Sequence, residues 1–150
     1  MIKKETIHHT HEKLLALQKL MHLEFNIKDV LQVMIGASIL AIPVGFTEET
    51  WKLGESLPLL NVIGFLILSL LFIAIFVYYN YYYTEHLKKH WDEFIKRVFS
   101  TYIFSFIVVA IVLTLIQRTP WSTNWILAFK RIVLVTFPAS MSAAVADMIK

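Results

Sequence analysis

The chain has 150 residues, of which 57% are hydrophobic and 17% are charged, and its formal net charge is +3. A soluble domain of this length is usually less apolar and more charged, so the composition argues against a soluble helical protein. Cysteine is absent, which excludes disulfide bonds, thiolate metal sites and cysteine nucleophiles.

The first 29 residues predict a cytoplasmic arm that contains an amphipathic helix. From about Thr10, apolar residues recur at helical spacing at Leu14, Leu17 and Met21, with charged and amide side chains between them. Such a helix can lie on the inner leaflet, pack on a partner or continue into the first span. The sequence leaves these three alternatives open.

Four apolar stretches approach or exceed the roughly 17–25 residues that a membrane-spanning helix needs. They cover residues 30–46, 57–79, 98–116 and 125–146, and the second and third contain no charge. We therefore predict an all-α fold, in which residues 1–29 form the arm with its amphipathic helix and residues 30–150 form a four-transmembrane-helix bundle.

The distribution of lysine and arginine predicts the orientation of this bundle. These residues concentrate in the arm and in the connection between the second and third spans, whereas the other two connections hold only Lys52 and Arg118. The positive-inside rule then places both termini in the cytoplasm of a multi-pass cell membrane protein. The basic charge is thus explained by orientation in the lipid bilayer, and we expect no nucleic acid partner.

The first span combines small residues with a proline. Ala37, Ala41 and Gly45 recur at every fourth position, a spacing that lets another helix approach closely. Pro43 lacks an amide hydrogen, so the carbonyl of Ile39 should lose its helical partner. Inside a bilayer, protein, water or an ion must then satisfy that carbonyl.

The fourth span has similar chemistry, with Pro138 inside it and Asp147 at its end. Its small residues are Ala139, Ser140, Ser142, Ala143, Ala144 and Ala146. We predict that the first and fourth spans pack against each other, or against symmetry mates, and carry the function. An acid at a helix C-terminus opposes the helix dipole, so Asp147 is expected to pair with Lys28, Lys88 or a bound cation, or else to be solvated.

Two segments carry a family resemblance. Residues 36–51 read GASILAIPVGFTEETW and residues 137–143 read FPASMSA. They resemble a group of small prokaryotic integral membrane proteins known as a domain of unknown function, and the similarity extends over most of the chain beyond residue 30. The resemblance implies a helical membrane fold and no particular activity, so it transfers no functional residue.

Charges at the outer ends of these spans are candidate functional groups. Glu48 and Glu49 follow the proline-containing first span, where carboxylates at a pore mouth would attract cations, although a solvated helix end is the simpler alternative. Lys130 and Arg131 lie five and six residues inside Trp125. They can snorkel to the surface or pair with Glu48 or Glu49, either as a structural bridge or as a gate that opens on protonation.

Histidines offer a second candidate site. His86 and His90 are four residues apart, so both imidazoles would lie on one face of a helix and could share a zinc or nickel ion. The sequence fixes no third ligand, and pH sensing is an alternative role for these histidines.

No nucleophile elbow, phosphate-binding glycine loop or zinc-protease motif occurs in the sequence, so we expect no enzyme and no cofactor.

The pattern favours a homo-oligomeric ion channel or transporter that prefers cations, with the first and fourth spans lining its pathway. Lining groups would be carbonyls freed by Pro43 and Pro138 and the hydroxyls of Ser38, Ser140 and Ser142. A non-transporting membrane scaffold that binds a partner is the alternative.

Overall fold

The computed structural model describes residues 11–15, 17, 26–82 and 91–149, and within these ranges the regular elements are all helical. After a helical piece at residues 11–15, the elements are α2 (Ile27–Gly45), α3 (Glu48–Ser56), α4 (Leu59–Val77), the π-helix η1 (Tyr78–Tyr82), α5 (Trp91–Leu115) and α6 (Trp125–Met148). The predicted all-α class is confirmed.

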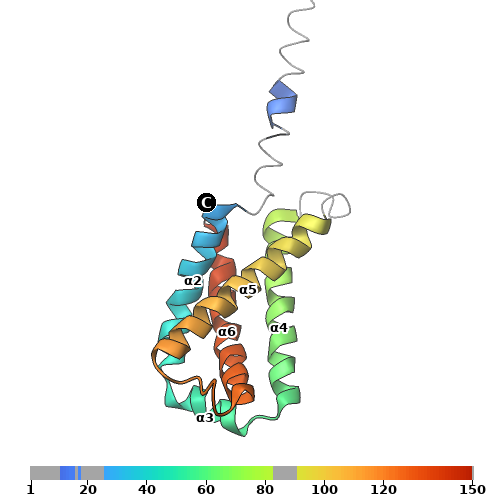
Figure 1. The fold of residues 1–150 in the computed structure, drawn as a ribbon. Coiled ribbons are helices and arrows are strands. Elements are labelled where there is room, and N and C mark those ends of the chain that lie inside the picture. Colours follow the sequence, from blue (N-terminus) through green and yellow to red (C-terminus); the bar gives the residue numbers. More distant parts are fainter. Residues whose placement is uncertain (1–10, 16, 18–25, 83–90, 150) are drawn as a thin grey trace, which may run out of the picture.

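Four helices are long and apolar enough to cross a membrane: α2, α4 extended by η1, α5 and α6. The chain crosses the bundle four times, so the start of α2 and the end of α6 lie at the same end, opposite α3 (Figure 1). We call these the terminal end and the α3 end. The predicted spans are thus present as helices, and the cytoplasmic position of the terminal end stays a prediction.

Helix α6 is the central helix of the bundle. Its apolar window is 56% buried, compared with 22% for α4 and 28% for α2, and it packs against α2, α3, α4 and α5. Helix α5 crosses the bundle at a slant, so it lies near α4 at the terminal end and farther from it at the α3 end (Figure 1). Helix α6 therefore supplies more of the buried apolar core than any other described helix.

The most extensive helix contact joins α2 to α6, which confirms that the first and fourth spans pack together. Its closest approach is at Gly36, where an added Cβ atom would lie 2.4 Å from the Cβ of Ala146 and 2.9 Å from the Cα of Ala143. Only a residue without a side chain fits there, because the backbones themselves are nearly in contact.

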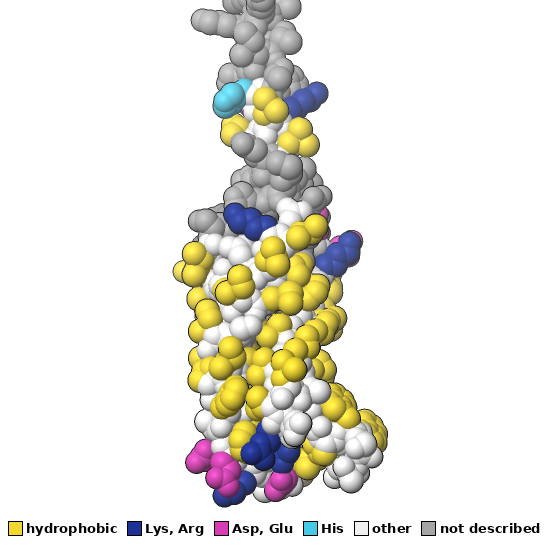
Figure 2. Space-filling model, turned by 60° about the vertical axis from the view of Figure 1, so that its left-hand side comes forward, with side chains coloured by type: hydrophobic (Ala, Val, Ile, Leu, Met, Phe, Trp, Pro, Cys, Tyr) yellow, Lys and Arg dark blue, Asp and Glu magenta, His cyan; other side chains and the backbone are white. Residues whose placement is uncertain are grey.

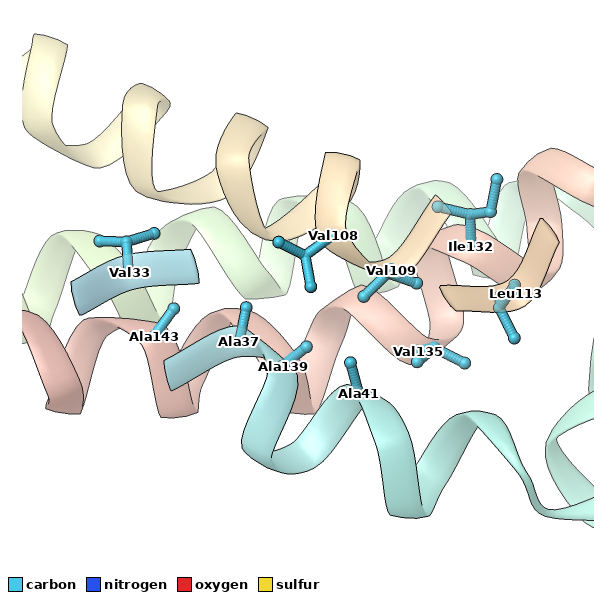
Figure 3. Close-up of a cluster of buried hydrophobic side chains, with 10 residues drawn as sticks. All are labelled: Val33, Ala37, Ala41, Val108, Val109, Leu113, Ile132, Val135, Ala139 and Ala143. Atoms are coloured by element: carbon cyan, nitrogen blue, oxygen red, sulfur yellow. The ribbon is translucent and has the colours of Figure 1, made fainter. Parts of the chain in front are cut away.

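Apolar side chains fill the middle of the bundle. The cluster joins α2, α5 and α6 and consists of Val33, Ala37, Ala41, Val108, Val109, Leu113, Ile132, Val135, Ala139 and Ala143 (Figure 3). A second cluster attaches α4 and contains Ile73, Val77, Val98, Tyr102 and Ala144. Burial of these side chains holds the helices together along most of their length.

The outward faces of α2, α4 and α5 carry large apolar side chains. Exposed examples are Leu31, Ile35 and Ile39 on α2, Leu60, Ile67 and Leu71 on α4, and Phe99, Ile103 and Ile111 on α5. Charged side chains gather at the two ends, with apolar surface between them (Figure 2). This arrangement suits a protein that sits in a lipid bilayer.

Candidate functional site

Buried charge is concentrated at the terminal end, where four side chains meet. We call them the Arg97 cluster: Asp29 on α2, Tyr81 on η1, Arg97 on α5 and Asp147 on α6. The exposed fraction is 0% for Arg97, 3% for Asp29 and 1% for Asp147. Charges removed from water to this degree are stable only when they are paired and hydrogen-bonded.

The local sequence places each acid at a helix end. Asn26 and Asp29 form a capping box at the start of α2, and the backbone N–H of Asn26 donates to the Asp29 carboxylate at 3.1 Å. Asp147 lies in the last turn of α6, where the helix dipole disfavours a negative charge. The adjacent guanidinium of Arg97 offsets that cost.

Arg97 connects these helix ends. Its Nη2 lies 3.0 Å from Oδ2 of Asp29, and its Nη1 lies 2.9 Å from Oδ2 of Asp147. Its guanidinium also lies 4.0 Å from the ring centroid of Tyr81, whose hydroxyl donates to the carbonyl of Asp147 at 2.8 Å. A single arginine thus ties α2, α5 and α6 together through charge-assisted hydrogen bonds.

Buried hydroxyls continue from this cluster toward the middle of the bundle. Thr101 and Ser105 follow Arg97 at successive four-residue steps on α5, and Ser140 and Thr136 precede Asp147 on α6; all four are 0% exposed. Three of them donate to carbonyls of their own helices. Within the described ranges, the hydroxyl of Thr101 has no hydrogen-bond partner.

An apolar layer lies between the α3 end and the hydroxyls of Thr101, Ser105 and Ser140, and Thr136 lies at the level of this layer. Val109, Leu113, Ile132 and Val135 are each 0% exposed and come from α5 and α6 (Figure 3). In this conformation the layer is closed, because the side chains pack against one another.

A second polar cluster lies at the α3 end, around Arg131. Its Nη2 lies 2.5 Å from Oε1 of Glu55, its Nη1 donates to the carbonyl of Arg118 at 2.7 Å, and its Nε donates to the carbonyl of Trp51 at 3.4 Å. The guanidinium of Arg118 lies 3.7 Å from the ring centroid of Trp51. These contacts hold α3 across the end of α6.

The family model described as "Putative integral membrane protein (DUF2391)" matches residues 2–149 of the chain. The chain belongs to this family. The match covers almost the whole sequence and confirms the resemblance seen in residues 36–51 and 137–143. Comparison with the curated proteins and with the solved structures finds no significant match.

For this DUF2391 member, the structure separates the predicted site residues. Glu48 pairs with Lys52 at 2.9 Å on the exposed side of α3, and Glu49 is also exposed. Arg131 pairs with Glu55, and not with the Glu48 or Glu49 that the pairing alternative named. Lys130, its neighbour, is half-buried.

Asp147 is buried and pairs with Arg97, whereas the sequence left a solvated acid or pairing with Lys28, Lys88 or a cation as the alternatives. Lys28 is exposed, and Lys88 lies outside the described residues, as do His86 and His90. Among the residues that the structure describes, no group of three or more His, Asp or Glu side chains is placed to hold a metal ion.

The hydroxyls and prolines of the predicted pathway lie in continuous helices. Ser38 donates to the carbonyl of Met34 at 2.8 Å, Ser140 is fully buried, and Ser142 is half-buried. Pro43 lies on the exposed side of α2, whereas Pro138 is half-buried in α6.

Sequence reasoning missed the central residue of the site, Arg97. It stands directly before the apolar run at residues 98–116, so it was counted with the charges of the connection. Helix α5 begins at Trp91, which places Arg97 nearly two turns inside the helix. The four-residue spacing of Arg97, Thr101 and Ser105 was the available signal for a buried polar face.

Proposed function

We propose that the protein transports a cation across the membrane through the interior formed by α2, α5 and α6. The observation that supports this function is the Arg97 cluster, in which three charged side chains are almost fully buried at the ends of membrane-length helices. Ionisable residues in such positions are costly, and they commonly mark a substrate or ion pathway.

The proposed route runs inside each protomer. The outward faces of α2, α4 and α5 carry large apolar side chains, which would line any channel formed along an axis between copies. The polar groups that suit a cation are instead buried inside the protomer, on α5 and α6. Helices α2 and α6, the predicted lining spans, contribute Asp29 and Asp147 to this route, and α5 adds Arg97 and Thr101.

The closed apolar layer acts as the gate of this route. Hydrophobic constrictions block ions until they widen and admit water. Arg131 and Glu55 form an ion pair at the α3 end, and the exposed carboxylates of Glu48 and Glu49 raise the local cation concentration there.

Flux measurements on purified protein in liposomes test this proposal. H⁺, Na⁺ and K⁺ are each supplied as a gradient, and the wild type is compared with Asp29→Asn, Asp147→Asn and the control Asp92→Asn. Asp92 is exposed in the first turn of α5 and matches the test residues in charge. At least one cation should cross, and the two cluster variants should lose that flux. Absence of flux for all three cations would eliminate transport.

A non-transporting scaffold is the second candidate, and the arm supports it. Leu14, Leu15 and Leu17 are 57%, 52% and 57% exposed in the helical segment that precedes the bundle. Such a segment can dock a cytoplasmic protein. Deleting residues 1–25 should then abolish recovery of that partner, and undiminished recovery would count against the scaffold.

A further inference from the structure

We propose that the transported cation is the proton and that Asp147 is its carrier. This inference rests on the proposed transport function and names the ion. Three features carry it: the tight packing of the interior, the shared arginine of the Arg97 cluster, and the buried hydroxyl of Thr101.

The described interior offers a metal cation no ready-made cluster of acidic or histidine ligands. Na⁺, K⁺ or a divalent ion needs a shell of several oxygen atoms around it. The described residues place no group of three acidic or histidine side chains together, and α2 and α6 approach so closely at Gly36 that a methyl group does not fit. A proton requires only one acceptor at a time, within hydrogen-bond distance.

The shared arginine allows Asp147 to be protonated without leaving a buried charge unpaired. Arg97 contacts Asp29 through Nη2 and Asp147 through Nη1, so it keeps the Asp29 ion pair when Asp147 becomes neutral. Among the described residues, further titratable groups in this part of the bundle are Tyr81 on η1, Glu93, one turn before Arg97 on α5, and Tyr102, which packs with Ala144 of α6. Arg97 therefore keeps a carboxylate partner in either protonation state of Asp147, so no buried charge is left alone.

The transfer step balances without any other reactant. An O–H bond of a hydronium ion at the terminal end breaks, and its proton forms an O–H bond with the Asp147 carboxylate, which leaves a water molecule. The new bond then breaks as the proton passes to a hydroxyl or water oxygen on the interior side. That oxygen releases another proton to the next acceptor, and the carboxylate is restored. No oxidation or reduction takes place.

Thr101 supplies a suitable acceptor next to the cluster. Its hydroxyl is fully buried, lies one helical turn beyond Arg97, and has no hydrogen-bond partner in the described part of the chain. A hydroxyl accepts one hydrogen bond while donating another, so it can pass a proton on without itself becoming charged. On α6, the buried hydroxyl of Thr136 lies five residues after Arg131, which corresponds to about 7.5 Å along the helix axis.

The experiment uses the full-length protein in liposomes that contain a pH-sensitive dye. Valinomycin and a K⁺ gradient set an inside-negative potential, and parallel liposomes contain a Na⁺-sensitive dye. We expect the interior to acidify without Na⁺ entry. Asp147→Asn should lower the initial rate about tenfold or more, whereas Asp92→Asn should leave it unchanged within about twofold.

Thr101→Val and Thr101→Ser form a matched pair that does not alter the ion pairs. Valine has nearly the same shape as threonine but lacks the hydroxyl, and serine keeps it. Thr101→Val should slow proton entry about tenfold, and Thr101→Ser should retain most of the rate. Thermal unfolding of both variants in detergent checks that the fold is intact.

The outcomes separate the two proposals. Entry of Na⁺ without acidification would overturn the proton assignment and leave cation transport standing. No entry of either ion, together with no K⁺ flux in the gradient assay without valinomycin, would overturn both. Acidification that is unaffected by Asp147→Asn, or equal in Thr101→Val and Thr101→Ser, would refute the carrier route described here.

Discussion

The contact between α2 and α6 gives the sharpest test of the fold, through the substitution Gly36→Ala. The new Cβ would lie 2.4 Å from the Cβ of Ala146, 2.9 Å from the Cα of Ala143 and 3.0 Å from the carbonyl oxygen of Ser142. Two of these three atoms belong to backbone, so the helices must move apart. Overpacking of this kind costs about 1–3 kcal/mol.

Gly64→Ala is the matched control, because a Cβ at Gly64 on α4 meets nothing within 4 Å. Both substitutions gain the same helix propensity, about 1 kcal/mol. Their difference in free energy of unfolding therefore isolates the clash, and Gly36→Ala should be the less stable by about 1–3 kcal/mol. Far-UV circular dichroism during denaturation in detergent micelles measures both. Equal stability of the two variants would refute the close approach of α2 and α6.

Three further substitutions test the charged ends by the same measurement. Arg97→Met should lower the free energy of unfolding by about 3–5 kcal/mol, because it leaves Asp29 and Asp147 buried without their cation; a loss below about 1 kcal/mol would contradict the pairing. Glu55→Gln should cost no more than about 1 kcal/mol, since this side chain is 59% exposed, and a greater loss would mean that its ion pair is shielded from water. Glu48→Gln should change stability by less than about 0.5 kcal/mol, and a larger change would reveal a contact beyond its exposed pair with Lys52.

The general fold was predictable from hydropathy and small-residue spacing alone. The four spans follow from the length of the apolar runs, because a bilayer leaves few alternatives to a helix. The pairing of the first and fourth spans followed from Gly36, Ala37, Ala143 and their neighbours, since small residues are what close helix packing requires.

Helix α3 was not predictable from the sequence pattern. Residues 48–56 are too polar for a span and were treated as a connection, yet they form a helix whose Gly54 packs against the side chain of Arg131. Only tertiary structure brings Arg131 to Gly54 and Glu55, because Arg131 lies more than 70 residues after them along the chain.

The partners in the Arg97 cluster were equally hidden. Asp29, Arg97 and Asp147 are far apart in sequence, and each is explained locally as a helix cap, a loop charge or a helix end. The burial of these three side chains is what distinguishes a functional cluster from three separate local roles. That burial depends on the slanted path of α5, and the apolar pattern of residues 98–116 does not specify this path.

The central position of α6 has a consequence for biogenesis. Helices α2, α4 and α5 are synthesised before it, yet α6 is the main neighbour of both α2 and α4. Until α6 enters the bilayer, the surface of α2 at Gly36, which α6 later covers, faces lipid. Arg97 also lacks its second carboxylate partner, Asp147. Insertion and packing are therefore separate stages, and a nascent chain halted before α6 would present quality-control proteases with inserted but unassembled helices.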